Sequence, residues 1–435
     1  MTEASTRARA AASQNRDASV AFLQELIRLQ PKGEDAVQAR MAAEFEALGC
    51  EISRLRYQPA DVTMKLEFAN ASAQAAEERE AITATLRGSG GGRSLIFFGH
   101  PDGEPIAGTE TWTHDPFAAT IENGRLYGWG IADDLAGIAT MTEAVRAIRS
   151  AGLTTQGDVI LTSTPSKRHA RGVHAVMQAG HLADAAIYCH PAESGVGMRE
   201  VKTFASGQVE FRVTVAGAPP PTTEPGHTAF AHLAVNPLDK ALVVIAALKA
   251  LDARRGDRIK HPSLEAAIGR STNLFITYIN CGNPNKFART PASATLGAAL
   301  SFPPGEALAD VQAEVLATIA EAAAADPFLA ANPPVVEWHA GVTGGEVPED
   351  HPLYQVVSAA VTAVTGAAPH INPLHTSSDI RNPMVQQGIP CVGLGPLCGD
   401  LTQTGRHDEW VDVEDWLKNV EVAAATIADW CGTKG

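Results

Sequence analysis

Short apolar runs that alternate with helical patterns constrain this chain more than any other feature. The clearest runs are Leu95-Ile-Phe-Phe, Val159 to Thr162 and Ala185 to Tyr188. They are almost entirely apolar, as expected of strands buried on both faces of a parallel sheet. Helical patterns from Leu135 to Ser150 and from Gly172 to Ala179 separate these runs. Strands and helices that alternate at these spacings predict a three-layer α/β sheet.

A different pattern begins at Gly207, where apolar and polar residues alternate strictly through Gln-Val-Glu-Phe-Arg-Val-Thr-Val. Such alternation is typical of a sheet with one face in solvent. The first pattern resumes near His351. At 435 residues the chain is also too long for one compact core. We therefore predict a larger α/β domain formed by residues 1–205 and 341–435, interrupted by a smaller α+β domain at 206–340.

The composition excludes several classes of partner. The chain is 45% hydrophobic and 19% charged and carries a formal net charge of -15. This balance suits a soluble globular protein and argues against nucleic acid or an anionic membrane as a partner. The first residues lack the apolar core of a secretory signal, and no run approaches the length of a membrane span. We expect a cytoplasmic protein with a small-molecule substrate.

Polar residues stand where the predicted strands end and where one helix begins. His100 and Asp102 follow the first strand, His190 follows the third, and Asp133 and Asp134 precede a helix. Because ligands gather at the carboxyl ends of parallel strands, we expect His100, Asp133 and His190 to form a metal site with open coordination positions. Asp102 would orient the His100 ring. Taken singly, the same residues also suit structural roles, such as capping of the helix by the aspartates.

Longer motifs resemble those of the M20 family of metallopeptidases, aminoacylases and related amidohydrolases. They extend over nearly the whole chain and comprise Leu95 to Asp102, Trp112 to Phe117, Asn123 to Asp134, Pro225 to His227, Thr376 to Arg381 and Asp408 to Val411. The resemblance implies a zinc-peptidase-like catalytic domain, a lid domain with dimer contacts, and a homo-oligomer. It also implies two metals bridged by the residue matching Asp133, the first of them completed by His100 and His190.

The stretch Thr164-Pro-Ser-Lys-Arg-His-Ala-Arg-Gly-Val departs from that family pattern. Where the resemblance implies two glutamates, the general base and a ligand of the second metal, this chain has Ser166-Lys167-Arg168. The histidine implied before the closing glutamate falls near Thr404 or Gly405, ahead of Glu409, with His407 out of register. Charged lysine and arginine cannot coordinate a cation. We therefore expect one divalent metal, manganese or zinc, held weakly by three protein ligands.

Three more residues are candidates by resemblance. His227 is similar to the lid histidine that reaches the active site across a dimer, although it also suits a loop beside a proline turn. Arg381 is similar to the arginine that grips a substrate carboxylate, a task that suits a guanidinium; a surface salt bridge is the alternative. His375 would line the same pocket or supply a missing metal ligand. We count His227, Asp102, Arg381 and His375 as the candidate catalytic residues.

The loss of the glutamate bears on the reaction. A general base supplies a factor of about 10²–10⁴, so hydrolysis of an unactivated amide becomes hard without one. A more electrophilic substrate could react with metal-activated water alone. Lys167, Arg168 and His169 could then neutralise negative charge on that substrate, unless they form only a solvated surface turn.

We expect hydrolysis of a C–N bond in a small carboxylate-bearing substrate. The pattern resembles aminohydrolases of electron-poor aromatic amines, of the 5-nitroanthranilate type, in which ammonia leaves the ring. Two alternatives stay open. The chain is an N-acyl amino acid or dipeptide hydrolase with another base, or a non-catalytic binding protein on the same scaffold.

Overall fold

The computed structural model describes residues 1–68, 77–167, 169–223, 226–372, 378–399 and 408–434, which fall into two compact units. Unit 1 comprises Met1–Thr63, Ser72–Ala205 and Glu346–Gly435, and unit 2 comprises Met64–Ala71 and Ser206–Gly345. The predicted boundaries need two corrections, because residues 341–345 and the segment from Met64 belong to unit 2. Phe68 explains the second correction, since its N–H donates to the Gly341 carbonyl at 3.0 Å and its ring packs on the unit 2 core.

A six-stranded sheet forms the centre of unit 1 as described, with the strand order β1-β2-β7-β3-β8-β17. β7, β3, β8 and β17 run parallel, and at one edge β2 pairs antiparallel with β7 and β1 pairs antiparallel with β2. The parallel strands match the apolar runs of the sequence. The strands are β1 (Glu51–Tyr57), β2 (Arg79–Leu86), β3 (Leu95–Gly99), β7 (Val159–Ser163), β8 (Ala185–Cys189) and β17 (Cys391–Leu394).

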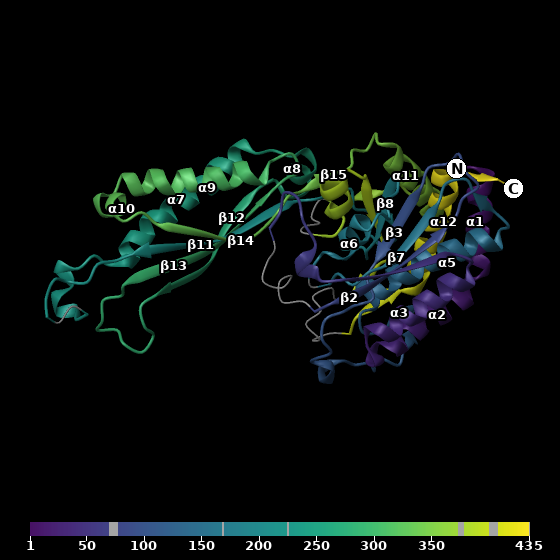
Figure 1. Ribbon diagram of the computed structural model, residues 1–435, viewed down its shortest axis with the longest axis horizontal. Helices are drawn as coiled ribbons and strands as arrows, with labels where there is room; N and C mark the ends of the chain where they lie inside the picture. Colours follow the sequence, from purple (N-terminus) through teal and green to yellow (C-terminus); the bar gives the residue numbers. More distant parts are fainter. Residues whose placement is uncertain (69–76, 168, 224–225, 373–377, 400–407, 435) are drawn as a thin grey trace. The chain divides into compact units, whose positions relative to one another are not determined.

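Helices cover both faces of this sheet, which confirms the predicted three-layer architecture (Figure 1). Alternate residues of β3 show the division: Leu95 and Phe97 pack in the larger core, and Ile96 and Phe98 in the smaller one. The helices of the larger core are α1 (Glu3–Gln14), α2 (Arg16–Leu29), α3 (Glu34–Ala47), α5 (Ala136–Ser150), α11 (Pro352–Thr365) and α12 (Val413–Cys431), and the smaller core includes α6 (Gly172–Gln178).

The closing helix α12 ties the larger core together. It packs against α1, α5 and α11. Trp416 is fully buried there, and its indole N–H lies 3.0 Å from both the Ala136 carbonyl and the Thr140 hydroxyl of α5. Burial of a large aromatic side chain with its polar atom satisfied stabilises both helices.

A small second sheet of unit 1 brings two distant parts of the chain together. Its described strands, in the order β18-β19-β5-β4, are β18 (Cys398–Gly399), β19 (Trp410–Asp412), β5 (Arg125–Tyr127) and β4 (Ile121–Glu122). β19 pairs with β5, so that Trp410 lies opposite Tyr127. The pairing places Glu409, just before β19, beside the segment that leads from β5 into α5.

Unit 2 is an antiparallel sheet backed by helices. Its described strands, in the order β12-β13-β11-β14, are β12 (Asn273–Cys281), β13 (Ser293–Phe302), β11 (Gly207–Ala216) and β14 (Val335–Val342). Every second residue of β11 is buried, as the alternation in the sequence predicts. The helices are α7 (Pro237–Arg258), α8 (Pro262–Ile268), α9 (Leu308–Ala324) and α10 (Pro327–Ala331), of which α7 and α9 contribute most to the core. No helix in the described ranges of either unit has both the length and the apolarity needed to cross a lipid bilayer.

Candidate functional site

The strand order brings three candidate segments to one edge of the unit 1 sheet. β3 lies between β7 and β8 and is parallel to both. Gly99, the last residue of β3, pairs with Ser163 at the end of β7, and Phe98 pairs with Tyr188 near the end of β8. The residues that follow these strands therefore leave the sheet side by side, at the carboxyl edge where open α/β sheets bind ligands.

Two histidines converge on one carboxylate at this edge. His100 Nε2 lies 2.7 Å from Asp133 Oδ1, and His190 Nε2 lies 3.9 Å from the same oxygen. The other ring nitrogen of each histidine faces a backbone carbonyl, that of Asp102 at 2.8 Å and that of Pro191 at 3.3 Å. A carbonyl accepts a hydrogen bond, so each Nδ1 carries hydrogen. Burial alone would lower the pKa of His100, but Asp133 and Asp102 raise it well above the usual value, so His100 Nε2 carries a proton that faces Asp133 and would have to lose it before binding a metal.

These three side chains fit a divalent metal in their chemistry, although His100 and Asp133 lie at a hydrogen-bonding distance and His190 lies farther away. Atoms that share a tetrahedral zinc ion lie roughly 3.3 Å apart, so separations of 2.7 and 3.9 Å would have to even out. Consistently, the described residues contain no group of three or more His, Cys, Asp or Glu side chains already arranged as a metal site. Two imidazoles and a carboxylate are nevertheless the donors that zinc and manganese accept.

Asp133 is ionised and firmly held. Burial alone would raise its pKa, but His100, Lys167 and His190 bring it well below the usual value. Asp133 lies in a non-helical turn before α5, with φ -132° and ψ 83°. The N-cap of α5 is Leu135, and no described side chain caps this helix, so Asp133 does not act as a helix cap, which was the structural alternative.

Glu409 fixes the turn that presents Asp133. Its carboxylate accepts hydrogen bonds from the backbone N–H groups of Gly130 at 2.8 Å, Ala132 at 2.7 Å and Asp133 at 3.3 Å. Burial raises the pKa of Glu409 to about 7, against the lowering effect of these bonds. The sequence marked Glu409 only as part of a motif. Its structural task depends on the β19–β5 pairing, which the sequence analysis did not predict.

Asp102 organises the loop that follows β7. Its two carboxylate oxygens accept the backbone N–H groups of Ser166 at 2.8 Å and Lys167 at 3.0 Å. The same carboxylate lies 3.4 Å from His100 Nδ1. Asp102 thus contacts the ring that it was predicted to orient, but its carboxylate chiefly anchors the neighbouring loop.

Lys167 and His169 do not form a solvated turn. The Lys167 ammonium donates to Asp133 Oδ2, and its side chain is 13% exposed. His169 is buried, its Nδ1 accepts the N–H of Arg171, and burial lowers its pKa to about 4. The predicted role of His169 as a positive charge is therefore wrong, because the ring is neutral at pH 7. Arg168 lies outside the described residues.

Arg381 is buried, so the surface salt bridge is also wrong. Its Nη1 donates to the Ser378 carbonyl at 2.8 Å. The neighbouring Asp379 accepts a hydrogen bond from the Ser166 hydroxyl, which links this segment to the loop after β7. Burial raises the pKa of Asp379. His375, the remaining candidate of this region, lies outside the described residues, as do Thr404, Gly405 and His407.

A buried ion pair supports the His190 segment. The Lys202 ammonium lies 2.7 Å from Glu200 Oε1, with side chains 1% and 0% exposed. Lys202 also donates to the Pro191 carbonyl, and Glu200 accepts the N–H groups of Glu193 and Ser194. Burial would raise the pKa of Glu200, but Lys202 and these donors lower it to about 2. The sequence analysis missed this pair, for which an acid and a lysine two residues apart gave no distinctive signal.

His227 belongs to unit 2. It precedes a short 3-10 helix, and its Nδ1 accepts the backbone N–H of Ala229 at 3.0 Å. A backbone bridge joins His227 to Arg289. One imidazole nitrogen is therefore used to cap a local turn, and the role by resemblance stays a prediction.

Comparison with known proteins identifies the class. An α/β sheet interrupted by a smaller unit, with histidines and an aspartate at its carboxyl edge, is an architecture suited to metal-dependent hydrolysis. Residues 96–429 match the model of Peptidase family M20/M25/M40. That match covers well over half of the sequence, so the chain belongs to this family and the predicted resemblance is confirmed. The chain accordingly belongs to a family of metal-dependent hydrolases of C–N bonds.

Solved structures agree in fold. The aminopeptidase PepT from Bacillus cereus ATCC 10987 is 17% identical, with a TM-score of 0.65 over 95% of this chain and 98% of its own. The di-peptidase Dug1p from Saccharomyces cerevisiae is 13% identical, with a TM-score of 0.62 over 99% of both chains. The YXEP protein of Bacillus subtilis, a dinuclear metal binding peptidase, is 14% identical, with a TM-score of 0.60 over 95% and 99%. At these identities the likeness shows the fold alone.

Proposed function

We propose that this protein hydrolyses a C–N bond in a small carboxylate-bearing substrate, with a divalent metal, manganese or zinc, bound labilely by His100, Asp133 and His190. The observation that carries the proposal is the convergence of both Nε2 atoms on Asp133 Oδ1. A bound divalent metal supplies a Lewis acid that lowers the pKa of water towards 7. The chain's own part is to hold Asp133 through Glu409 and to turn both imidazoles toward it.

The best candidate reaction is hydrolytic deamination of an electron-poor aromatic amine, as for a 5-nitroanthranilate-like substrate. Support comes from three carboxylates near the site that accept hydrogen bonds from the chain's own donors. Asp102 and Glu409 accept backbone N–H groups, and Asp379 accepts the Ser166 hydroxyl. A ring that stabilises negative charge itself makes the least demand on a general base. Arg381 and Arg168 are proposed to meet the substrate carboxylate.

Hydrolysis of dipeptides or N-acyl amino acids is the second candidate. The specific observation in its favour is that solved structures with this fold include human carnosine dipeptidase 1 and the yeast di-peptidase. This reaction needs a replacement base, for which His375 and His227 are the proposed residues. A non-catalytic binding protein is the third candidate.

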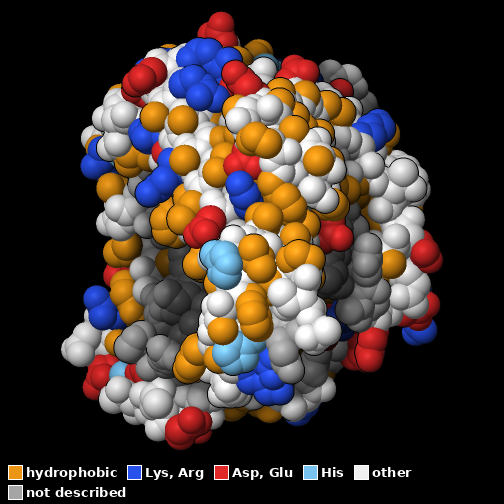
Figure 2. Space-filling view, turned by 90° about the vertical axis from the view of Figure 1, so that its left-hand side faces the viewer, with side chains coloured by type: hydrophobic (Ala, Val, Ile, Leu, Met, Phe, Trp, Pro, Cys, Tyr) orange, Lys and Arg blue, Asp and Glu red, His pale blue; other side chains and the backbone are white. Residues whose placement is uncertain are grey.

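We also propose a cytoplasmic homo-oligomer that binds no nucleic acid and no membrane. β12 is an edge strand of the unit 2 sheet as described, and edge strands offer unpaired backbone groups to a second copy. Phe275 and Ile279 of this strand are 70% and 50% exposed. Figure 2, which faces the part of unit 2 near α10, shows hydrophobic side chains gathered on that surface. Light scattering on the wild type and on Phe275→Glu tests the assembly, and a wild-type monomer would contradict it.

The activity is tested by product release with manganese or zinc supplied. Electron-poor aromatic amino acids are assayed for ammonia, and N-acyl amino acids and dipeptides for free amine. Ammonia from an aromatic amine alone supports the aminohydrolase. Cleavage of the acyl or peptide panel alone supports the second candidate and contradicts the first. No turnover with either metal, together with tight binding of a panel compound, would leave only the binding protein.

A further inference from the structure

The two oxygens of Asp133 face different partners. Oδ1 is turned towards His100 and His190, at 2.7 and 3.9 Å. Oδ2 accepts a hydrogen bond from the Lys167 ammonium. The carboxylate therefore stands between a pair of imidazoles, which can bind a metal, and a lysine, which cannot. An ammonium has three donors and no lone pair.

The fold places Lys167 at this position through its backbone. The segment that leaves β7 is bound at successive residues: the Thr164 N–H donates to the Gly99 carbonyl at 3.0 Å, and the Pro165 carbonyl accepts the Tyr57 hydroxyl at 2.7 Å. The Lys167 N–H then donates to Asp102 at 3.0 Å. Lys167 thus extends its side chain from a fixed backbone, and its contact with Asp133 is built into the sheet edge.

A cation at this place has an electrostatic consequence. A carboxylate that bridges two divalent ions must offer one oxygen to each of them. Here the second oxygen already has a positive partner, in a pocket where Asp133 and Lys167 are 11% and 13% exposed. In such a poorly screened environment, an additional divalent cation near Oδ2 would be repelled by the ammonium.

We propose that Lys167 is a resident cation that replaces a second metal, so that the protein binds one divalent ion per chain. This departs from the similar dinuclear peptidase of Bacillus subtilis, and it rests on the proposed metal site at His100, Asp133 and His190. Lys167 leaves Asp133 Oδ1 to the metal and keeps Oδ2 neutralised. Lys167 is thereby the residue that sets the number of metals.

Equilibrium dialysis against manganese, with metal measured by mass spectrometry, tests this assignment. We expect one ion per wild-type chain and none at the same free concentration for His190→Ala. Lys167→Glu removes the cation and adds a ligand, so it should bind a second ion. Lys167→Met only frees Oδ2, so it should bind a second ion more weakly. Lys167→Met also tests the role of Lys167 if the Lys167→Glu variant does not fold. Lys249→Glu makes the same charge change on α7 of unit 2, and it should still bind one ion.

The outcomes separate this inference from the proposed function. Two ions per wild-type chain, or one ion in every folded Lys167 variant, would overturn the role of Lys167 while leaving the metal site in place. No saturable ion in the wild type would overturn the metal site itself. A second manganese ion close to the first would also show as a spin-coupled signal in electron paramagnetic resonance, and we expect that signal in Lys167→Glu and not in the wild type.

Discussion

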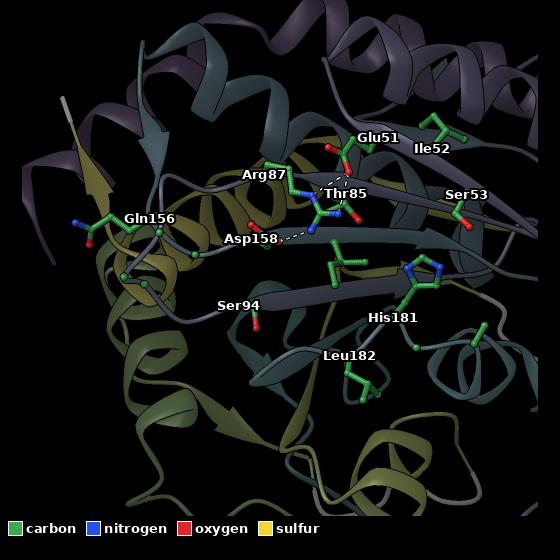
Figure 3. A pocket seen from close by; sticks show the side chains of 17 residues that line it. Glu51, Ile52, Ser53, Thr85, Arg87, Ser94, Gln156, Asp158, His181 and Leu182 are labelled. Carbon is green, nitrogen blue, oxygen red and sulfur yellow. Dashed lines mark hydrogen bonds and ion pairs between the residues drawn. The ribbon is translucent and has the colours of Figure 1, made fainter.

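The two ends of the unit 1 sheet make a useful comparison, because both carry ionisable residues. At the amino ends of β3 and β7 lies a groove of about 610 Å³ (Figure 3). There Arg87 bridges Glu51 at 2.9 Å and Asp158 at 2.8 Å. At the carboxyl ends, His100 and His190 face the same oxygen of Asp133. At the amino ends opposite charges form ion pairs, whereas at the carboxyl ends two imidazoles face one carboxylate oxygen.

The two ends differ in how far their ionisable groups are buried, and this difference distinguishes the candidate functional site from an ordinary surface groove. The groove at the amino ends is open, and Arg87 and Glu51 are 61% and 64% exposed, so their ion pair is screened by water. The cluster at the carboxyl ends is buried, and each of its contacts shifts a pKa or fixes a loop. Cavity volume therefore does not locate the chemistry here. Convergence of buried polar atoms does.

The largest effect should come from removing a member of the convergent cluster. His190→Ala takes away one of two imidazoles that face Asp133, so we expect turnover to be abolished and metal binding to be lost. Metal titration and product release measure both effects. Circular dichroism checks that the variant is folded. A folded and fully active His190→Ala would contradict the metal mechanism.

The next largest effect should come from the support behind His190. The double variant Lys202→Met/Glu200→Gln removes the ion pair without leaving a single buried charge, but it also removes the donor to the Pro191 carbonyl. Loss of such support typically weakens metal affinity by about 10–100-fold. Absorption of the cobalt-substituted protein should also change, since the His190 ring is less fixed.

A matched control separates this support from general stability. Glu143→Gln breaks another ion pair of unit 1, between the buried Glu143 and the partly exposed Arg146, both on α5. It should lower the melting temperature without changing the cobalt spectrum. Equal spectra for all three proteins would show that the Lys202 pair serves stability alone.

A pH effect of intermediate size should arise from His169. An unfolded imidazole has a pKa of about 6.5, and burial lowers the folded pKa to about 4. Between these values the unfolded state binds more protons, so stability falls as the pH drops from 6.5 to 4, by on the order of 3 kcal/mol. The free energy of unfolding, measured with urea at several pH values in this range, should depend less steeply on pH in His169→Gln than in the wild type. Identical slopes in the two proteins would contradict a buried neutral ring.

The smallest effect is expected at the amino ends of the strands. Arg87→Ala removes two exposed ion pairs, and because water screens them each contributes little to stability. Melting temperature should change by a few degrees at most, and metal binding and turnover should stay as in the wild type. A loss of turnover in Arg87→Ala would break the distinction between the two ends of the sheet.

The sequence predicted much of the fold because its strong signals are local. The runs that form β3, β7 and β8 are short and apolar, and the alternation in β11 is strict. β1, β2 and helix α1 were not predicted, because β1 and β2 carry charged residues among the apolar ones and α1 is largely polar and exposed. Phe68 packs on unit 2 through contacts with residues far along the chain, and no local sequence pattern predicts such contacts.

The grouping of His100, Asp133 and His190 was predictable from the sequence, and the residues that support them were less so. His100, Asp133 and His190 stand at strand and helix ends, where periodicity can place them. The contacts of Lys167 with Asp133 and of Asp102 with the loop after β7 depend on β3 lying next to β7, a neighbour relation that spacing alone does not give. His169 was misjudged because its burial, beside Tyr57 and within the loop, keeps the imidazole neutral.

The order of the segments along the chain has a consequence for folding during synthesis. The core of unit 2 is almost contiguous, so it can assemble while later residues are still being made. Unit 1 must wait for β17 at one edge of its sheet and for α12 on its face. Glu409, which grips the turn that holds Asp133, emerges after every residue of the candidate metal set. A nascent chain therefore carries all its ligands well before it can position them, and early metal capture would meet an unformed site.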